Sequence, residues 1–156
     1  MNKEELMEKA VERSSFGMKN DFGGPFGAVI VKDGEIVAEG FNNVTSSNDP
    51  TAHAEVTAIR NACKKLNTFD LSGCELYTSC EPCPMCLAAI YWARIDKIYY
   101  ANTKEDAANI NFNDDFIYKE FEKDKFERSI PMEQLGRESA IKVFEEWIKK
   151  EDKIEY

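Results

Sequence analysis

The sequence predicts an α/β fold of three layers, in which helices cover both faces of a central mixed sheet of about five strands. At 156 residues the chain suits one compact domain with one sizeable core. Short apolar runs bounded by turn residues alternate with longer segments of helical periodicity. Their order is a β-hairpin, then helix, strand, helix and strand, which makes the later strands parallel and places helices beside the sheet.

The first element is predicted to be a helix that runs to about residue 20. Asn2 followed by Glu5 forms a capping-box pattern at its start. Residues 22–25, Phe-Gly-Gly-Pro, end it. The side chains expected on its buried stripe are Leu6, Ala10, Val11, Ser14 and Met18.

A β-hairpin and two helix–strand pairs should follow. Residues 26–31 have the composition of a buried strand, Asp33 and Gly34 form a strong hairpin turn, and residues 36–38 should return antiparallel. After a polar loop at 42–49, helices and strands are expected to alternate at residues 52–66, 75–78, 84–93 and 97–101.

The C-terminal part has weaker patterns. Residues 106–113 suggest a short helix and a loop, residues 116–121 could be helix or strand, and residues 137–150 form an amphipathic helix. No linker divides the chain, so we expect residues 1–156 to be a single domain.

Composition and charge exclude several functional classes. The chain is 43% hydrophobic and 12% aromatic, which is typical of a globular protein. Its net charge of −9 would repel a phosphate backbone, and the lysine pairs at 64–65 and 149–150 are too short to compensate. A small uncharged substrate is therefore expected, and no nucleic acid. A charged N-terminus without a following apolar run, and no stretch that could span a bilayer, indicate a cytoplasmic protein with no membrane partner.

Three of the five cysteines lie close together, at Cys80, Cys83 and Cys86. In a protein that is not secreted, this spacing indicates metal or redox chemistry more than a disulfide framework. The isolated Cys63 and Cys74 are interpreted as small buried hydrophobic residues.

The only histidine completes a zinc pattern. His53 precedes Glu55 by two residues, and Pro82 precedes the pair Cys83 and Cys86. The arrangement H-x-E followed by P-C-x-x-C is typical of zinc nucleobase deaminases. Because Pro84 suits the first helical position, both sulfurs should lie in a first helical turn, which favours thiolates. We expect one Zn²⁺ per subunit, with water or hydroxide as its fourth ligand.

The carboxylate of Glu55 is the expected proton shuttle for that water. Residues two apart do not share a helical face, so this role depends on an irregular first turn and on family resemblance. Two alternatives remain open. The C-x-x-C pair could be a redox pair, which would leave His53 and Glu55 without a role. Cys80 could instead close a structural Cys₃His zinc site.

The chain resembles bacterial guanine deaminases of the cytidine-deaminase fold. The similarity is dense over residues 1 to about 120 and sparse from 121 onwards, and its most specific segments are residues 23–34, 42–45, 47–55, 76–86 and 90–94. The resemblance implies that zinc is bound by His53, Cys83 and Cys86, with Glu55 as shuttle aided by Asp114. It also implies a set of purine-binding residues: Phe26, Asn42, the Ala54 backbone, Trp92, Asp114 and Tyr156.

The implied reaction is hydrolysis of guanine to xanthine and ammonia. A carboxylate at Asp114 could accept from N1–H and the 2-amino group, and the Asn42 amide could pair with the O6 or N7 edge. Asn42 could also be a turn residue, and Asp114 a solvated loop acid. Residues 121–156 are expected to be a lid and dimerisation segment that relatives exchange within a homodimer. The rival interpretations are a tRNA adenosine deaminase or another nucleobase deaminase, and a zinc-stabilised binding module without turnover.

Overall fold

A four-stranded mixed sheet forms the centre of the N-terminal part of the chain. The structure is a computed structural model that describes residues 1–156. The strands are β1 (Gly27–Lys32), β2 (Glu35–Phe41), β3 (Cys74–Cys80) and β4 (Lys97–Asn102), in the spatial order β2-β1-β3-β4. β1 pairs antiparallel with β2 and β3, whereas β3 and β4 are parallel. The α/β class and the mixed sheet are confirmed, with four strands in place of about five.

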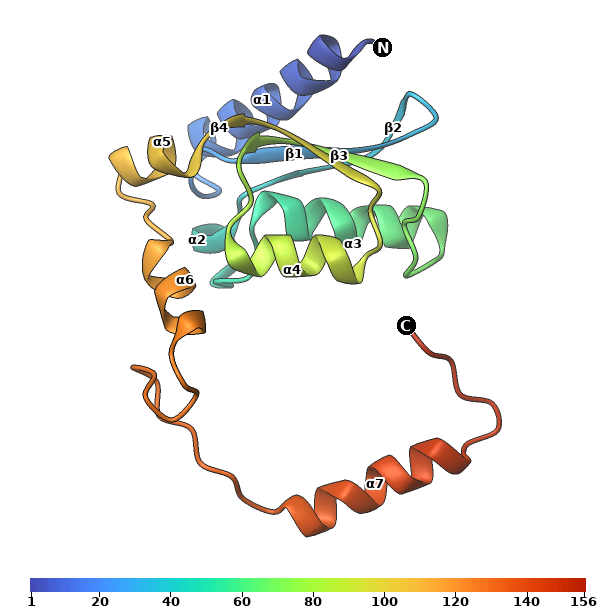
Figure 1. The fold of residues 1–156 in the computed structure, drawn as a ribbon. Coiled ribbons are helices and arrows are strands. Elements are labelled where there is room, and N and C mark those ends of the chain that lie inside the picture. The colour runs from blue at the N-terminus through green and yellow to red at the C-terminus, as the bar shows by residue number, and fades with distance from the viewer. The chain divides into compact units, whose positions relative to one another are not determined.

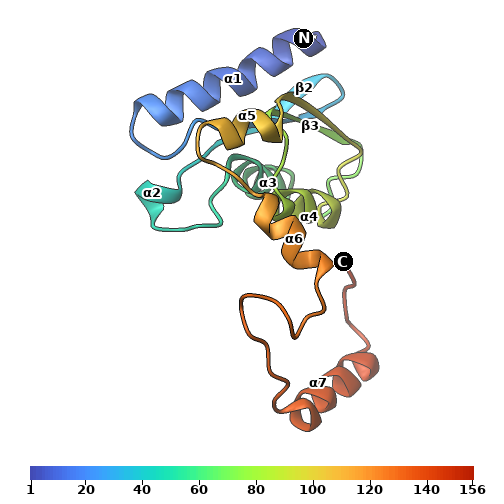
Figure 2. The same cartoon turned by 60° about the vertical axis from the view of Figure 1, so that its left-hand side comes forward.

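Helices cover both faces of this sheet (Figure 1). α1 (Lys3–Lys19) lies on one face, and α3 (Ala54–Leu66) and α4 (Pro84–Trp92) lie on the other, as the turned view in Figure 2 also shows. Successive side chains of β1 point to opposite faces of the sheet. Ala28 and Ile30 belong to the core cluster with α3 and α4, and Val29 and Val31 to the cluster with α1. A strand buried on both faces needs an uninterrupted apolar run, which is the pattern found in the sequence.

The hairpin between β1 and β2 has the predicted turn. Asp33 and Gly34 both have positive φ, 51° and 78°, as a two-residue type I′ turn requires. Lys32 pairs with Glu35, so the turn occupies only those two residues.

The start of α1 is confirmed and part of its buried stripe is wrong. Asn2 and Glu5 form the reciprocal capping box. Leu6 and Ala10 are buried, but Met18 is 45% exposed and Gly17 is buried in its place. Residue 17 lies seven positions, or about two helical turns, after Ala10 and therefore on the same face of the helix. Because Gly17 has no side chain, Phe41 can pack against it.

Several boundaries differ from the sequence prediction. The expected polar loop contains a short helix, α2 (Val44–Ser47), and the helix expected from residue 52 begins at Ala54. α5 (Lys104–Asn109) confirms a short helix in that region. Cys63 is only half-buried, because it packs at the edge of the core, whereas Cys74 is fully buried as predicted.

The chain divides into two compact units, Met1–Asp114 and Asp115–Tyr156. The second contains α6 (Asp115–Glu122) and α7 (Arg137–Lys149). Residues 116–121, left open between helix and strand, are helical, and an ion pair of 2.8 Å joins Asp115 to Lys119 at i,i+4 spacing. No residue of 115–156 is buried. None of the helices has both the length and the apolar character of a bilayer-spanning segment.

Gly40 allows the start of α3 to pack directly on β2. A Cβ at Gly40 would lie 2.3 Å from the Ala54 carbonyl oxygen and 2.6 Å from the Ala58 amide nitrogen. These are backbone atoms, so Gly40→Ala must displace the helix. We expect a loss of about 3 kcal/mol in the free energy of unfolding, as for overpacked cores.

Gly34→Ala provides the comparison for Gly40→Ala. Gly34 has open space around it, but its φ of 78° strains any side chain, at a cost of about 1 kcal/mol. Urea denaturation measures both variants. A smaller loss at Gly40 than at Gly34 would contradict the close approach of α3 to β2.

Candidate active site

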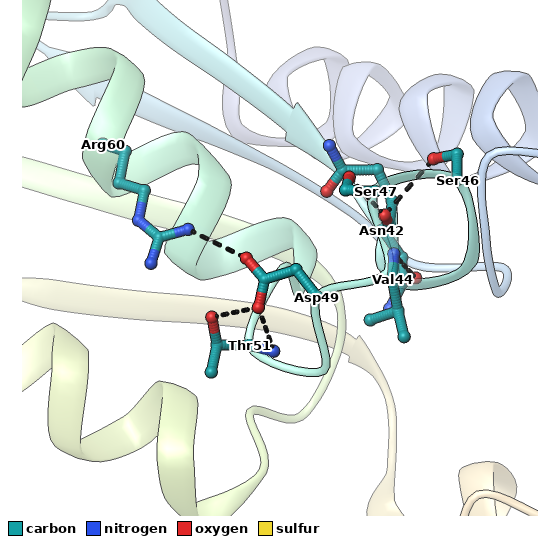
Figure 3. Close-up of polar contacts among 8 residues, drawn as sticks. Asn42, Val44, Ser46, Ser47, Asp49, Thr51 and Arg60 are labelled. Carbon is teal, nitrogen blue, oxygen red and sulfur yellow. Dashed lines mark hydrogen bonds and ion pairs between the residues drawn. The ribbon is translucent and has the colours of Figure 1, made fainter.

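His53 lies at the N-cap of α3, in extended backbone (φ −70°, ψ 158°). The turn before it is fixed by Asp49, whose Oδ1 accepts from the Thr51 amide at 2.8 Å and from the Thr51 hydroxyl at 2.6 Å. The other carboxylate oxygen of Asp49 lies 3.8 Å from Arg60 (Figure 3). The sequence prediction missed Asp49 as a positioning residue, although Asp-Pro-Thr before a helix is a typical side-chain-to-backbone turn.

Cys83 and Cys86 occupy the first turn of α4, as predicted. Cys83 is the N-cap with Pro84 at the first helical position, and its Sγ accepts from the Cys86 amide at 3.5 Å. Cys86 is fully buried. A local signal, proline directly after the capping residue, is sufficient to place these sulfurs.

The histidine and the two cysteines form one group with the dimensions of a zinc site. The Nδ1 of His53 lies 3.5 Å from Cys83 Sγ and 3.4 Å from Cys86 Sγ, and the three ligand atoms lie within 4.8 Å of one another. Tetrahedral zinc separates an imidazole nitrogen from a thiolate sulfur by about 3.6 Å, given its usual bond lengths. The residues therefore fit zinc by donor type and by distance.

The electrostatics of the pair also favour a cation. Hydrogen bonds with Cys86 and His53 lower the pKa of Cys83 to about 4. Its contact with Cys83, together with burial, raises the pKa of Cys86. Without a metal ion, the two cysteines therefore carry one thiolate and one neutral thiol. A second thiolate at this short distance would need a positive ion beside it.

Glu55 reaches the same group from the first turn of α3. It is only 6% exposed, and this burial raises the pKa of its carboxyl group. The carboxyl group also lies near enough to Cys86 for that thiol to lower its pKa and offset part of the rise. The i,i+2 spacing does not separate Glu55 from His53, because His53 precedes the helix and lacks helical dihedral angles.

Cys80 is buried at the end of β3, outside the three-residue group. Its Sγ lies 3.7 Å from the carbonyl oxygen of Thr103, to which it can donate, and burial raises the pKa of its thiol to about 11. A neutral thiol that donates to a backbone carbonyl is not in the thiolate form that binds zinc. This arrangement disfavours the closed Cys₃His alternative.

Cys80→Ala should therefore keep its metal. We expect one zinc per chain and turnover within about twofold of the wild type, with a stability loss of about 1 kcal/mol from the small void. Metal analysis and a steady-state assay are the measurements. Loss of zinc from this variant would restore the structural-site interpretation.

Two of the expected substrate residues, Asn42 and Ala54, lie at the ends of the segment between β2 and α3, and the Asn42 backbone amide donates to the Phe26 carbonyl at 3.0 Å. Asn42 is 6% exposed, and its Oδ1 accepts from the amides of Gly24 and Val44. Ala54 is the first residue of α3, where an amide has no partner within the helix. Phe26 packs edge-on against Phe112, with ring centroids 5.0 Å apart.

Asp114 is half-buried, and burial is the main cause that raises the pKa of its carboxyl group. The charge of Cys83 acts in the same direction. Asp114 therefore lies within electrostatic reach of the zinc-site residues.

One expected substrate residue of the first unit, Trp92, lies away from this group, and another expected substrate residue, Tyr156, belongs to the other unit. Trp92 ends α4 and is 68% exposed, about 9 Å along the helix axis from Cys86. Tyr156 belongs to the second unit and is 74% exposed. Their roles in substrate binding stay predictions.

Two polar residues near these elements had no role in the sequence prediction. Ser79 is buried in β3, and its hydroxyl accepts from the Gly27 amide at 3.0 Å, which fixes the start of β1. Asn43 follows Asn42, and its Oδ1 is a buried acceptor without a protein donor. Such an oxygen favours a donor from water or a ligand. The paired asparagines were visible in the sequence, but their burial was not.

The chain was compared with known families, proteins and structures. Residues 1–102 match the family described as cytidine and deoxycytidylate deaminase zinc-binding region. The guanine deaminase of Bacillus subtilis is 56% identical over 156 residues, which is the full length of both chains. The crystal structure of a Bacillus subtilis guanine deaminase superimposes with a TM-score of 0.97, covering 100% of this chain and 99% of that one. The chain belongs to the guanine deaminase family of zinc-dependent deaminases.

Similarity to the tRNA deaminases covers a smaller part of the chain. The tRNA-specific adenosine deaminase of Aquifex aeolicus is 52% identical over 77 residues, which is 49% of this chain and 51% of that protein. The similarity to this tRNA deaminase therefore covers about half of the chain, whereas the similarity to the guanine deaminase covers all of it.

Proposed function

We propose that this protein hydrolyses guanine to xanthine and ammonia. The full-length similarity to a guanine deaminase supports this function most strongly, because it extends past the zinc-binding region to residue 156. The tRNA deaminases match between 49% and 64% of the chain. The net charge of −9 also favours a small neutral base over a polyanion.

One zinc ion per subunit would be held by His53, Cys83 and Cys86, with water in the fourth position. Bound zinc lowers the pKa of its water towards neutrality and polarises it for attack. The helix N-cap at Cys83 and the buried environment of Cys86 hold the two sulfurs in place.

Glu55 moves the protons of the reaction. Its carboxylate takes a proton from the attacking water and delivers it to N3 of the purine as the C2–O bond forms. A second proton passes from the new C2 hydroxyl group through Glu55 to the 2-amino group, so that the C2=O bond of xanthine forms, the C2–N bond breaks and ammonia leaves. Burial of Glu55 keeps bulk water from exchanging with these protons.

Asn42, Ala54, Asp114 and Phe26 bind and orient the base. The Asn42 amide and the free amide at the start of α3 are donors for the O6 and N7 edge. Asp114 accepts from N1–H and the 2-amino group and assists Glu55. The ring of Phe26, backed by Phe112, forms a wall of the pocket.

Residues 121–156, which form most of the second unit, would serve as a lid and dimerisation segment exchanged between the subunits of a homodimer. Its residues are all at least partly exposed, and α7 leaves large apolar side chains such as Val143, Phe144 and Ile148 uncovered. An amphipathic helix in this condition favours a second copy as its partner. Tyr156 would then close the partner's pocket. The five cysteines are free thiols, which a reducing compartment preserves, so a cytoplasmic location is part of the proposal.

Ammonia release tests the function directly. Guanine, adenine, cytosine and a tRNA anticodon stem are incubated with the purified protein, and zinc content is measured in the same sample. Turnover of guanine alone supports the proposal, and turnover of the tRNA alone would replace it. A protein that binds zinc and releases no ammonia from any of them is a binding module.

A further inference from the structure

The side chain of Asn42 can adopt only one orientation. Its buried carboxamide meets the amide of Gly24 at 3.3 Å and the amide of Val44, labelled with Asn42 in Figure 3, at 3.1 Å. Both partners are donors, so only the oxygen of the carboxamide can face them. The amide nitrogen therefore lies on the other side, and Asn42 offers donors alone to a ligand.

Gly23 makes this orientation possible by its lack of a side chain. A Cβ at Gly23 would lie 2.2 Å from Asn42 Oδ1 and 2.7 Å from the Asn42 carbonyl oxygen. Any other residue would push the carboxamide out of place or move the loop. Close approach, and not a special backbone angle, is the reason for glycine here.

The loop that carries Gly23 is held at Phe22. The Phe22 carbonyl accepts from the Ser46 amide at 3.1 Å, the Ser46 hydroxyl at 2.8 Å and the Thr45 hydroxyl at 3.1 Å. The ring of Phe22 packs in a cluster with Phe16 and Phe41, with centroids 6.2 and 5.1 Å away. Residues 22–24, held by α2 and by this cluster, are called the 22–24 clamp.

We infer that the 22–24 clamp sets substrate specificity by fixing Asn42 as a donor towards an oxygen at C6 of the purine. The inference rests on the proposed function. Guanine carries an acceptor at C6, whereas a purine with the same 2-amino leaving group and a second amino group at C6 would place another donor opposite Asn42. Two donors that face each other in a closed site leave buried polar groups unpaired. The site would therefore strongly favour a base with an acceptor at C6 over a base with a donor there. Gly23 and Ser46 are thus positioning residues that act through Asn42.

Three variants and two competitive inhibitors test this inference. The variants are Gly23→Ala, Ser46→Ala and Ser47→Ala, and the inhibitors are hypoxanthine, with oxygen at C6, and purine, with hydrogen there. For Gly23→Ala we expect the KM for guanine and the Ki for hypoxanthine to rise about tenfold. The Ki for purine should change by less than about twofold, because purine has no oxygen at C6. The kcat should change as little, because the bond to the C6 oxygen holds guanine equally in the ground state and the transition state.

Ser46→Ala and Ser47→Ala form a matched pair on α2. The Ser46 hydroxyl is exposed and shares its acceptor with two other donors, so its loss should raise the same two constants about threefold. Ser47 donates only to the Asn43 carbonyl, at 2.7 Å, and does not reach Phe22. Its variant should behave as the wild type. Zinc content and melting temperature are recorded for each variant.

The outcomes separate this inference from the proposed function. Equal changes in both Ki values, or an unchanged KM in a folded and zinc-loaded Gly23→Ala, would overturn the inference alone. If Gly23→Ala does not fold, the double variant Thr45→Val/Ser46→Ala replaces it, and a wild-type ratio of the two Ki values would overturn the inference. If the wild-type protein does not turn over guanine, both the proposed function and this inference are wrong.

Discussion

Glu55→Gln is expected to reduce kcat for guanine about a thousandfold, which is within the usual contribution of a positioned acid–base group. Glutamine has the size of glutamate, and it can neither take a proton from water nor return one to the ring. The side chain is 6% exposed beside Cys86, so no bulk water can replace it. The KM should change little, because Glu55 is not among the groups proposed to hold the base.

The measurement combines steady-state kinetics with metal analysis and a binding titration with xanthine. We expect one zinc per chain and wild-type affinity for xanthine. Glu39→Gln is the matched control: this carboxylate lies on β2 and makes a partly exposed ion pair with Arg13 at 3.5 Å, so its loss should leave kcat unchanged. Near-normal turnover by Glu55→Gln would remove Glu55 from the mechanism.

Local patterns were sufficient to predict the metal group. Proline after Cys83 fixes the start of α4 and the capping position of Cys83. Likewise, Asp33 and Gly34 determine the hairpin by themselves. Each of these signals lies within a few residues of the structure it specifies. The capping position of His53 was not predicted, because that helix was expected from residue 52 and begins at Ala54.

Features that depend on distant contacts were missed. The orientation of Asn42 depends on Gly24, 18 residues away, so the sequence could not show that Asn42 offers only its amino side. Phe41 of β2 explains why Gly17, and not Met18, is buried in α1. The fifth strand that residues 116–121 could have formed is absent, because these residues form α6. Ion pairs at helical spacing within 115–123 favour this helix. Periodicity in a short segment does not contain that information.

Removal of the metal should abolish activity and destabilise the protein, because zinc would bind the folded site and not the unfolded chain. At a free zinc concentration a thousand times its Kd, the stabilisation is about 4 kcal/mol. For a chain of this size, the melting temperature should fall by about 10 °C after chelation. Adding back zinc should restore both properties, and magnesium should not, because thiolate and imidazole donors suit the softer ion.

Cys86→Ser should reproduce the chelated state permanently. Cys86 Sγ is fully buried and 3.4 Å from His53 Nδ1, and Cys83 is the only other cysteine in the metal-binding group. We expect zinc affinity to fall at least about a hundredfold, with no detectable ammonia release. Cys80→Ala, which removes a buried thiol outside the group, is the control that should keep its zinc. Full activity of a protein shown to be free of metal would contradict hydrolysis by a zinc-activated water, and with it the roles given to His53, Cys83 and Cys86.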